Sequence, residues 1–243
     1  MKQDTDTREV GSLVGFTFRD WWRVLRDNRF AVSRRYWRRW MPVTLLSLRN
    51  SRFKRKEDEQ FGEEVEKAET KPPLFVLGHW RSGTTLLHSL LIQDERFTYP
   101  NLFQVTFPHI FLSMAEVVER QMAREEAERR AMDNVQVTYN SPGEDEFALA
   151  VLSLRSPTLA WMFPRREQHY DRYLTFQDVS AEEVAIWKAS FIDFLKKLAC
   201  CDARPPVLKS PPHTARIRLL LEMFPDARFV HISRHPHQVF RST

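Results

Sequence analysis

One segment around residue 80 constrains the fold more than any other part of the chain. Residues 74–77 (Leu-Phe-Val-Leu) are an apolar run typical of a buried strand, and an apolar stretch of helical spacing follows the loop between Gly78 and Gly83. A strand, a glycine-flanked loop and a helix in this order direct backbone N–H groups and a helix N-terminus toward an anion. The segment therefore predicts a phosphate-like ligand at the end of a strand.

The loop departs from the common triphosphate-binding pattern at one position. The spacing from Gly78 to Gly83 fits G-x-x-x-x-G-K-[ST], but Thr84 stands where a lysine would reach the β- and γ-phosphates. A cation occurs earlier in the loop, at Arg81. This departure argues against a P-loop NTPase or kinase, which remains the less favoured alternative.

A second anion site is predicted near the end of the chain. Residues 227–232 read as a β-branched and aromatic strand, and Pro236 suits the first position of a helix. Arg234 stands at the end of that strand, and Ser242 follows eight positions later. Because the arginine fork binds phosphate through two nitrogens, Arg234 and Ser242 are expected to form a second clamp.

Together the two segments resemble the donor-binding motifs of the sulfotransferases. The loop at 81–85 resembles their 5′-phosphosulfate loop, and Arg234 to Ser242 resembles their 3′-phosphate strand and helix. Lys209-Ser210-Pro211 is also similar to a Lys-x-Pro element of bacterial and carbohydrate-type members. The resemblance spans roughly residues 72–243 and implies the donor 3′-phosphoadenosine 5′-phosphosulfate (PAPS), with product 3′-phosphoadenosine 5′-phosphate (PAP) and no metal. The implied donor-binding residues are Arg81, Ser82, Gly83, Thr84, Thr85, Leu86, Arg234 and Ser242.

Such a reaction transfers a sulfuryl group to a hydroxyl or amine and needs cations beside the departing phosphate. Arg81 is the expected cation at the bridging oxygen, where negative charge develops. Lys209 is a second candidate, either on the donor or on the acceptor. Its alternative interpretation is a strand-end lysine in an ion pair, and the sequence does not separate the two.

The general base is expected among the carboxylates of residues 144–146. Ser141 and Glu144 fit a capping box with Pro142 at the first helical position, which gives Glu144 a structural role. Glu146 is therefore the preferred base, since the helix dipole favours an ionised carboxylate near the N-terminus. Asp145 and Glu144 follow. His79, His88 and His213 are competitors that are each better explained as structural histidines.

Alternating helical and strand patterns with two phosphate loops predict an α/β fold of the phosphate-loop nucleotide-binding type, with a parallel sheet covered by helices. A basic aromatic helical extension is expected over residues 1–70 and the donor-binding domain over 71–243. A capping box at Ser180 predicts a helix whose aromatic positions, beginning with Trp187, enter the core. Sulfotransferases normally continue beyond the position that corresponds to Thr243. The resemblance therefore implies a truncated C-terminal part and a folded but weakly active chain.

Charge is concentrated at the beginning of the chain. Residues 1–56 hold fifteen Lys or Arg against five Asp or Glu, whereas the whole chain has a formal net charge of +5. Aromatic residues alternate with arginines over residues 16–40, which fits packing onto the body or peripheral contact with an anionic membrane. A non-catalytic membrane-associated or scaffolding remnant is the alternative function. No nucleic-acid motif occurs.

The remaining features bear on compartment and acceptor. The two cysteines, Cys200 and Cys201, are adjacent and cannot form a disulfide framework. No segment has the length of a membrane span, and no secretory signal is visible. A cytoplasmic protein, peripheral on the membrane if residues 16–40 contact lipid, is therefore expected. The acceptor could be a small molecule, a lipid or a carbohydrate.

Overall fold

A three-stranded parallel sheet anchors one end of the molecule. The computed structural model describes residues 13–122, 128–129 and 136–242. Its sheet has the order β4-β1-β5, built from β1 (Leu74–Leu77), β4 (Val207–Lys209) and β5 (Arg228–His231). Phe75 of β1 lies opposite Leu208 and Phe229 in the two parallel pairings. The carboxyl ends of all three strands therefore meet at one edge, and the predicted α/β fold with a parallel sheet is confirmed.

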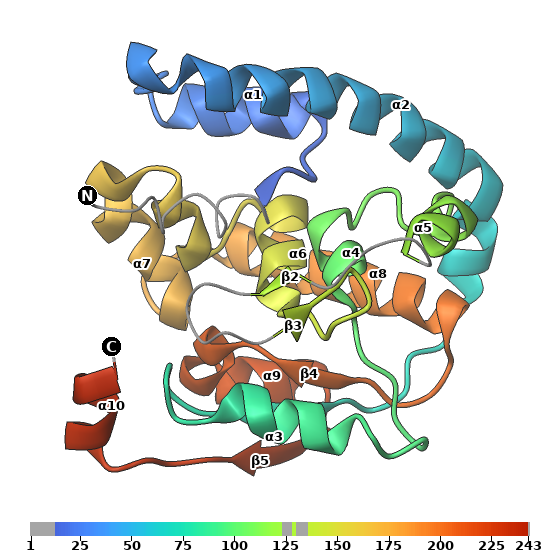
Figure 1. Ribbon diagram of the computed structural model, residues 1–243, viewed down its shortest axis with the longest axis vertical. Coiled ribbons are helices and arrows are strands. Elements are labelled where there is room, and N and C mark those ends of the chain that lie inside the picture. The colour runs from blue at the N-terminus through green and yellow to red at the C-terminus, as the bar shows by residue number, and fades with distance from the viewer. Residues whose placement is uncertain (1–12, 123–127, 130–135, 243) are drawn as a thin grey trace.

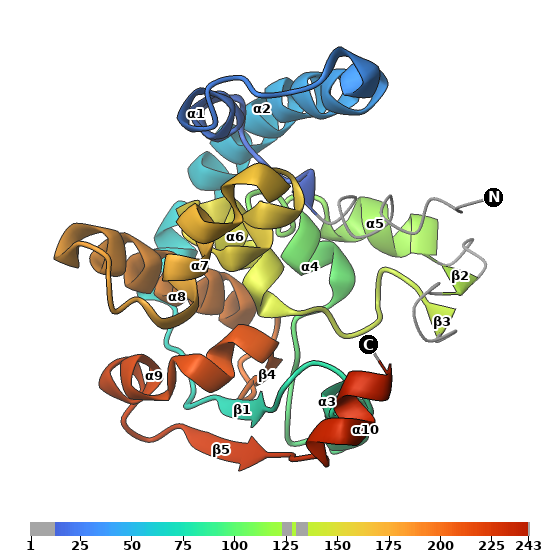
Figure 2. The ribbon, with the colours of Figure 1, turned by 90° about the vertical axis from the view of Figure 1, so that its left-hand side faces the viewer.

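Helices occupy the rest of the described chain (Figures 1 and 2). The α-helices that follow β1 are α3 (Thr84–Leu91), α4 (Leu102–Thr106), α5 (Ala115–Met122), α6 (Asp145–Ser153), α7 (Glu167–Thr175), α8 (Ala181–Cys201), α9 (Ile217–Met223) and α10 (Pro236–Ser242). Single 3-10 turns are η3 (Arg34–Tyr36), η4 (Pro157–Trp161), η5 (Pro164–Arg166) and η6 (Pro211–Ala215), and a small antiparallel pair joins β2 (Glu128–Arg129) to β3 (Gln136–Val137).

The N-terminal helices form a hairpin at the opposite end of the long axis from the sheet (Figures 1 and 2). This hairpin consists of α1 (Phe18–Asp27) and the 31-residue α2 (Trp37–Lys67), whose later part packs against α8. Trp21 of α1 is buried in the same apolar cluster as Phe75. The proposed boundary near residue 70 stays a prediction, and residues 1–12 of that extension lie outside the described part. None of the described helices is long and apolar enough to cross a membrane.

Helix α8 is capped by Ser180 and buries its aromatic residues as its sequence predicts, and it also contacts the sheet. Ser180 caps the helix by accepting the Glu183 N–H (3.2 Å), and Trp187 and Phe191 are fully buried. The Phe75 ring of β1 stacks on Phe229 with centroids 5.3 Å apart and meets Phe191 edge-on at 6.3 Å. These aromatic contacts hold β1 and β5 against α8 and fix the strand ends that carry the loops.

The predicted start of α6 is wrong. The helix begins at Asp145 with Glu144 as N-cap residue and no side-chain capping bond, rather than at Pro142 behind a Ser141 cap. The Ser141 Oγ instead accepts the Thr138 N–H (2.9 Å). The Gly143 N–H donates to the Pro100 carbonyl (2.8 Å), so the segment before α6 is bound to a distant part of the chain. The Glu144 side chain is thereby released from the structural role that the capping box gave it.

Candidate donor-binding and active site

Two loops leave the sheet side by side, because β1 and β5 are parallel neighbours. The Ile232 N–H donates to the Leu77 carbonyl (3.0 Å), which extends the pairing to the point where the loops begin. A Cβ on Gly78 would lie 2.8 Å from both the Ile232 carbonyl oxygen and the Ser82 Oγ. Glycine at 78 is therefore required by close approach of the two loops.

The loop between Gly78 and Gly83 is held by internal hydrogen bonds. The Gly78 N–H donates to Thr214 Oγ1 (2.9 Å), and the Ser82 N–H and Oγ both donate to the His79 carbonyl (3.1 and 2.7 Å). The hydroxyl of Ser82 is thus part of the turn itself. Thr214 was not singled out from the sequence, since its role depends on η6 packing beside the end of β1.

The N-terminus of α3 is suited to bind an anion. Gly83 is its N-cap residue in the left-handed region (φ 102°), without a side-chain capping bond. The first amides of a helix have no intrahelical acceptor and carry the positive end of the helix dipole. The N–H groups of Thr84, Thr85 and Leu86 occupy these positions. The Leu86 side chain is 67% exposed, so this residue would contribute its backbone only.

The structure brings the two predicted anion sites into contact. The Arg81 Nε donates to the Ser242 carbonyl (2.8 Å), and the Arg234 Nη1 donates to the Arg81 carbonyl (3.0 Å). Helix α10 begins at Pro236 as predicted and lies beside the loop that precedes α3. Residues more than 150 positions apart in sequence therefore form one cationic rim beside the α3 amides.

Lys209 occupies the corresponding position at the end of β4, on the other side of β1. Its Nζ lies 2.5 Å from Glu144 Oε1. The Lys209 side chain is 5% exposed and that of Glu144 is 28% exposed, so the carboxylate forms the accessible side of the pair. The ion pair that the sequence offered as one interpretation of Lys209 is present. Its catalytic role stays a prediction.

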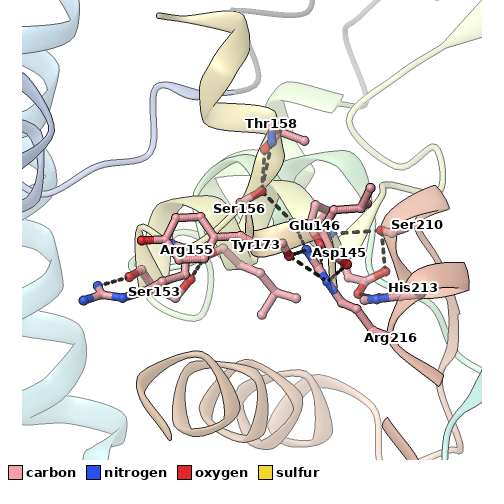
Figure 3. Close-up of polar contacts among 12 residues, drawn as sticks. Asp145, Glu146, Ser153, Arg155, Ser156, Thr158, Tyr173, Ser210, His213 and Arg216 are labelled. Atoms are coloured by element: carbon pink, nitrogen blue, oxygen red, sulfur yellow. Dashed lines mark hydrogen bonds and ion pairs between the residues drawn. The ribbon is translucent and has the colours of Figure 1, made fainter. Parts of the chain in front are cut away.

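Asp145 and Glu146 face the interior instead (Figure 3). Asp145 accepts the Ser210 hydroxyl (2.9 Å) and contacts His213 Nε2 (2.5 Å). Burial opposes ionisation of Asp145, but the His213 charge and these hydrogen bonds outweigh it, and the pKa of Asp145 lies below its usual value. The pair is fully buried and joins α6 to η6.

Glu146 is similarly enclosed (Figure 3). Its carboxylate binds the Arg216 guanidinium through two contacts of 2.5 and 3.0 Å and accepts the Ser156 hydroxyl (2.6 Å). Both partners of the ion pair are 1% exposed. The sequence-preferred base is therefore engaged in a structural contact, and its catalytic role remains a prediction that this geometry does not favour. Neither Arg216 nor Ser156 was singled out from the sequence, because contacts across 70 and 10 positions leave no local pattern.

The three competing histidines differ in environment. His213 is bound to Asp145, and the His79 ring contacts the neighbouring Trp80 carbonyl (2.9 Å). His88 on α3 is buried, and its Nε2 has no hydrogen-bond partner among the described residues. Burial and, secondly, the charge of Lys209 lower the pKa of His88 to about 4. His88 is thus neutral near pH 7 and sits behind the site.

Comparison with known proteins identifies the family. The profile of the Sulfotransferase family matches residues 72–243. The chain belongs to the sulfotransferase family. The matched range begins just before β1 and contains both loops, so the family assignment and the strand-end geometry concern the same part of the molecule.

Several mycobacterial proteins are similar to this sulfotransferase-family chain. It is 40% identical over 236 residues to omega-hydroxy-beta-dihydromenaquinone-9 sulfotransferase Stf3 of Mycobacterium bovis and of Mycobacterium tuberculosis, covering 95% of this chain and 59% of each relative. The sulfotransferase STF1 of Mycobacterium tuberculosis has a similar fold (TM-score 0.52, 21% identity, 96% of this chain and 62% of that one). STF9 of Mycobacterium avium gives the same TM-score of 0.52 at 22% identity, over 79% of this chain and 49% of that one. The chain thus spans about three fifths of the length of its curated relatives.

Proposed function

We propose that this chain binds PAPS and transfers its sulfuryl group to a hydroxyl acceptor. The observation that carries the proposal is the contact of Arg81 with Ser242 and Arg234 beside the amides of α3. A helix N-terminus with an adjacent arginine suits one phosphate, and the neighbouring Arg234 supplies a second cation. This arrangement supports a donor that carries an anion at each end.

The reaction asks the protein mainly for positioning and charge stabilisation. The acceptor oxygen forms a bond to sulfur, the bond from sulfur to the 5′-phosphate oxygen breaks, and its electron pair leaves with PAP. Arg81 is placed at the tip of the loop to stabilise the charge that develops on that oxygen. Lys209, at the end of the adjacent strand, is the second cation for the same purpose.

Glu144 is the base that the geometry favours. It lies at the same sheet edge as the loop before α3, since it is bound to Lys209 at the end of β4. Its carboxylate is partly exposed, so it can take the acceptor proton, whereas Glu146 would have to leave Arg216 to do so. Lys209 holds the Glu144 carboxylate at the end of β4 while the proton is transferred.

A lipid-type alcohol is the acceptor class we infer. The curated relatives at 40% identity are named for sulfation of an omega-hydroxylated dihydromenaquinone. Helices α3 and α10, which border the proposed donor site, also expose large apolar side chains. Leu86 and Leu90 lie on one face of α3, and Phe240 on α10 is 84% exposed. An apolar tail would find contacts beside the donor site, which a sugar would not use.

Two measurements test the proposal separately. Titration calorimetry with PAP should give saturable heat, and PAP should raise the melting temperature because it binds only the folded state. Arg81→Glu combined with Arg234→Glu should remove both effects. Titration without heat overturns the donor assignment.

Sulfate transfer from labelled PAPS should favour an omega-hydroxylated prenyl quinol over a water-soluble sugar. Transfer to the sugar alone overturns the acceptor class and leaves the donor assignment intact.

A further inference from the structure

Helix α2 has its polar and apolar faces reversed relative to an ordinary surface helix. Its protein-facing side carries small polar residues: Ser47 is fully buried and Asn50 is 1% exposed. Asn50 Nδ2 donates to the Val14 and Phe16 carbonyls, both at 3.1 Å. In a water-facing helix these inward positions are normally apolar. Hydrogen bonds therefore attach the first half of α2 to α1 and to the segment before it, while Leu45 and Leu48 stay exposed.

More polar contacts hold α1 against this inner side. Trp21 Nε1 donates to Thr44 Oγ1 (2.8 Å), and the Phe18 N–H donates to Ser51 Oγ (2.8 Å). These bonds fix the rotation of α2 about its axis. The opposite side of the helix therefore faces outward because these bonds hold it there.

The outward side of α2 is apolar in the middle and basic at both ends. At 3.6 residues per turn the positions 38, 41, 45, 48, 49 and 52 share one side of the helix. We call this set the outer α2 face: Arg38, Met41, Leu45, Leu48, Arg49 and Arg52. Met41, Leu45 and Leu48 are 39%, 62% and 46% exposed. This is the pattern of a helix that lies in a membrane interface, with an apolar stripe between cations.

An exposed aromatic pair lies at the same end of the molecule as the outer α2 face. Trp22 of α1 is 51% exposed and packs edge-on against Phe30, which is 49% exposed, with ring centroids 5.2 Å apart. Exposed arginines at 19, 23 and 26 accompany this pair on α1. Tryptophan is favoured at the level of lipid headgroups because its ring is apolar and its N–H is polar.

Charge decides which partner fits this surface. Residues 13–56 contain thirteen Lys or Arg and only two acidic residues, Asp20 and Asp27. A two-fold contact between copies places the same patch against itself, so like charges would meet. An anionic bilayer provides both the opposite charge and an apolar layer. We propose that the outer α2 face, with Trp22 and Phe30, docks this protein peripherally on anionic phospholipid.

Vesicle sedimentation with the whole chain tests this. Binding should be strong to phosphatidylcholine vesicles containing phosphatidylglycerol, weak to pure phosphatidylcholine, and reduced by high salt. Leu45→Gln with Leu48→Gln should weaken binding about tenfold, because the apolar stripe is lost. Arg49→Glu with Arg52→Glu should weaken it by about 30-fold or more, since two basic residues near the surface are lost and two negative charges replace them.

Helix α9, near the sheet, supplies matched controls. Leu221 is 44% exposed, a fraction similar to that of Leu48, and Arg218 is also exposed. Leu221→Gln and Arg218→Glu should leave vesicle binding unchanged, and thermal melts should show all variants folded. Equal binding of the α2 and α9 variants overturns the proposal. It is overturned as well if wild type ignores vesicles but forms dimers that Leu45→Gln dissociates, because the occupant is then a second copy.

Discussion

Lys209 Nζ lies 2.5 Å from Glu144 Oε1, and this pair joins the carboxyl end of β4 to the N-cap residue of α6. Two positions further along, Glu146 points away and binds the buried Arg216. Two glutamates separated by one residue thus have different surroundings, one at the sheet edge and one in the core. This difference makes their roles separable by mutation.

Glu144→Gln should lower the transfer rate by about 10²- to 10⁴-fold, the range for loss of a general base. PAP affinity should change little, whereas stability should fall, because the buried Lys209 ammonium loses its charged partner and keeps only the glutamine oxygen. Single-turnover transfer at saturating PAPS, with a parallel PAP titration, measures the two effects.

Glu146→Gln should act mainly on stability. The change leaves Arg216 as a buried cation without its charged partner, which typically costs about 3–5 kcal/mol of unfolding free energy. Urea unfolding measures the loss. Should Glu146→Gln abolish transfer at unchanged stability while Glu144→Gln does not, Glu146 is the base, as the sequence alone suggested.

Replacing the rim arginines should weaken donor binding. Arg81→Met and Arg234→Met should each lower PAP affinity about 10- to 100-fold, because a charge-assisted hydrogen bond contributes about 1.5–3 kcal/mol. PAP titration of each variant measures the loss. Arg96→Met is the control, since this exposed arginine is paired with Asp94 beyond the end of α3. An equal loss in the control would indicate a general charge effect and contradict a specific site.

Local sequence rules predicted the elements that carry the donor loops. The β1 run, the glycine loop, the Pro236 start of α10 and the Ser180 cap each depend on residues within one turn or strand. The contact between Arg81 and Ser242 was not predicted, because no local pattern links two residues 161 positions apart.

The start of α6 could not be predicted in the same way. Ser141 and Glu144 satisfy a capping box locally, but the Leu102 N–H donates to the Ser141 carbonyl (2.8 Å), and a bond 39 positions away in sequence competes with the cap. The partner of Glu146 is equally remote. Which carboxylate faces the site was thus set by tertiary contacts that periodicity and spacing do not encode.

Alanine at the two loop glycines should have unequal effects. A Cβ at Gly83 would meet only Ile232 Cδ1 at 3.5 Å, so its cost comes from φ at 102°, about 1–2 kcal/mol. At Gly78 the Cβ would collide with the Ile232 carbonyl oxygen at 2.8 Å, so the loops must separate and the loss should be larger. Thermal or urea unfolding ranks the variants.

Gly62 in α2 supplies the matched control. A Cβ there meets nothing within 4 Å, and its helical position favours alanine by about 0.5–1 kcal/mol. Gly62→Ala should therefore raise stability. Equal destabilisation by Gly78→Ala and Gly83→Ala would contradict the close approach of the loops.

His88 should make the protein less stable in mild acid. Burial and then Lys209 lower the pKa of His88 to about 4, whereas an unfolded histidine titrates near 6.5. Between these values the unfolded chain binds the extra proton, so stability is full above about pH 6.5 and falls as pH decreases toward 4. The share from His88 is about 2 kcal/mol between pH 7.5 and pH 5. His88→Phe should remove that share of the pH dependence in urea unfolding. An acid loss of about the same size should persist from His109, whose pKa burial lowers to about 3. An unchanged difference between the two pH values in His88→Phe would show that His88 has the same pKa in the folded and the unfolded chain, and would contradict the prediction.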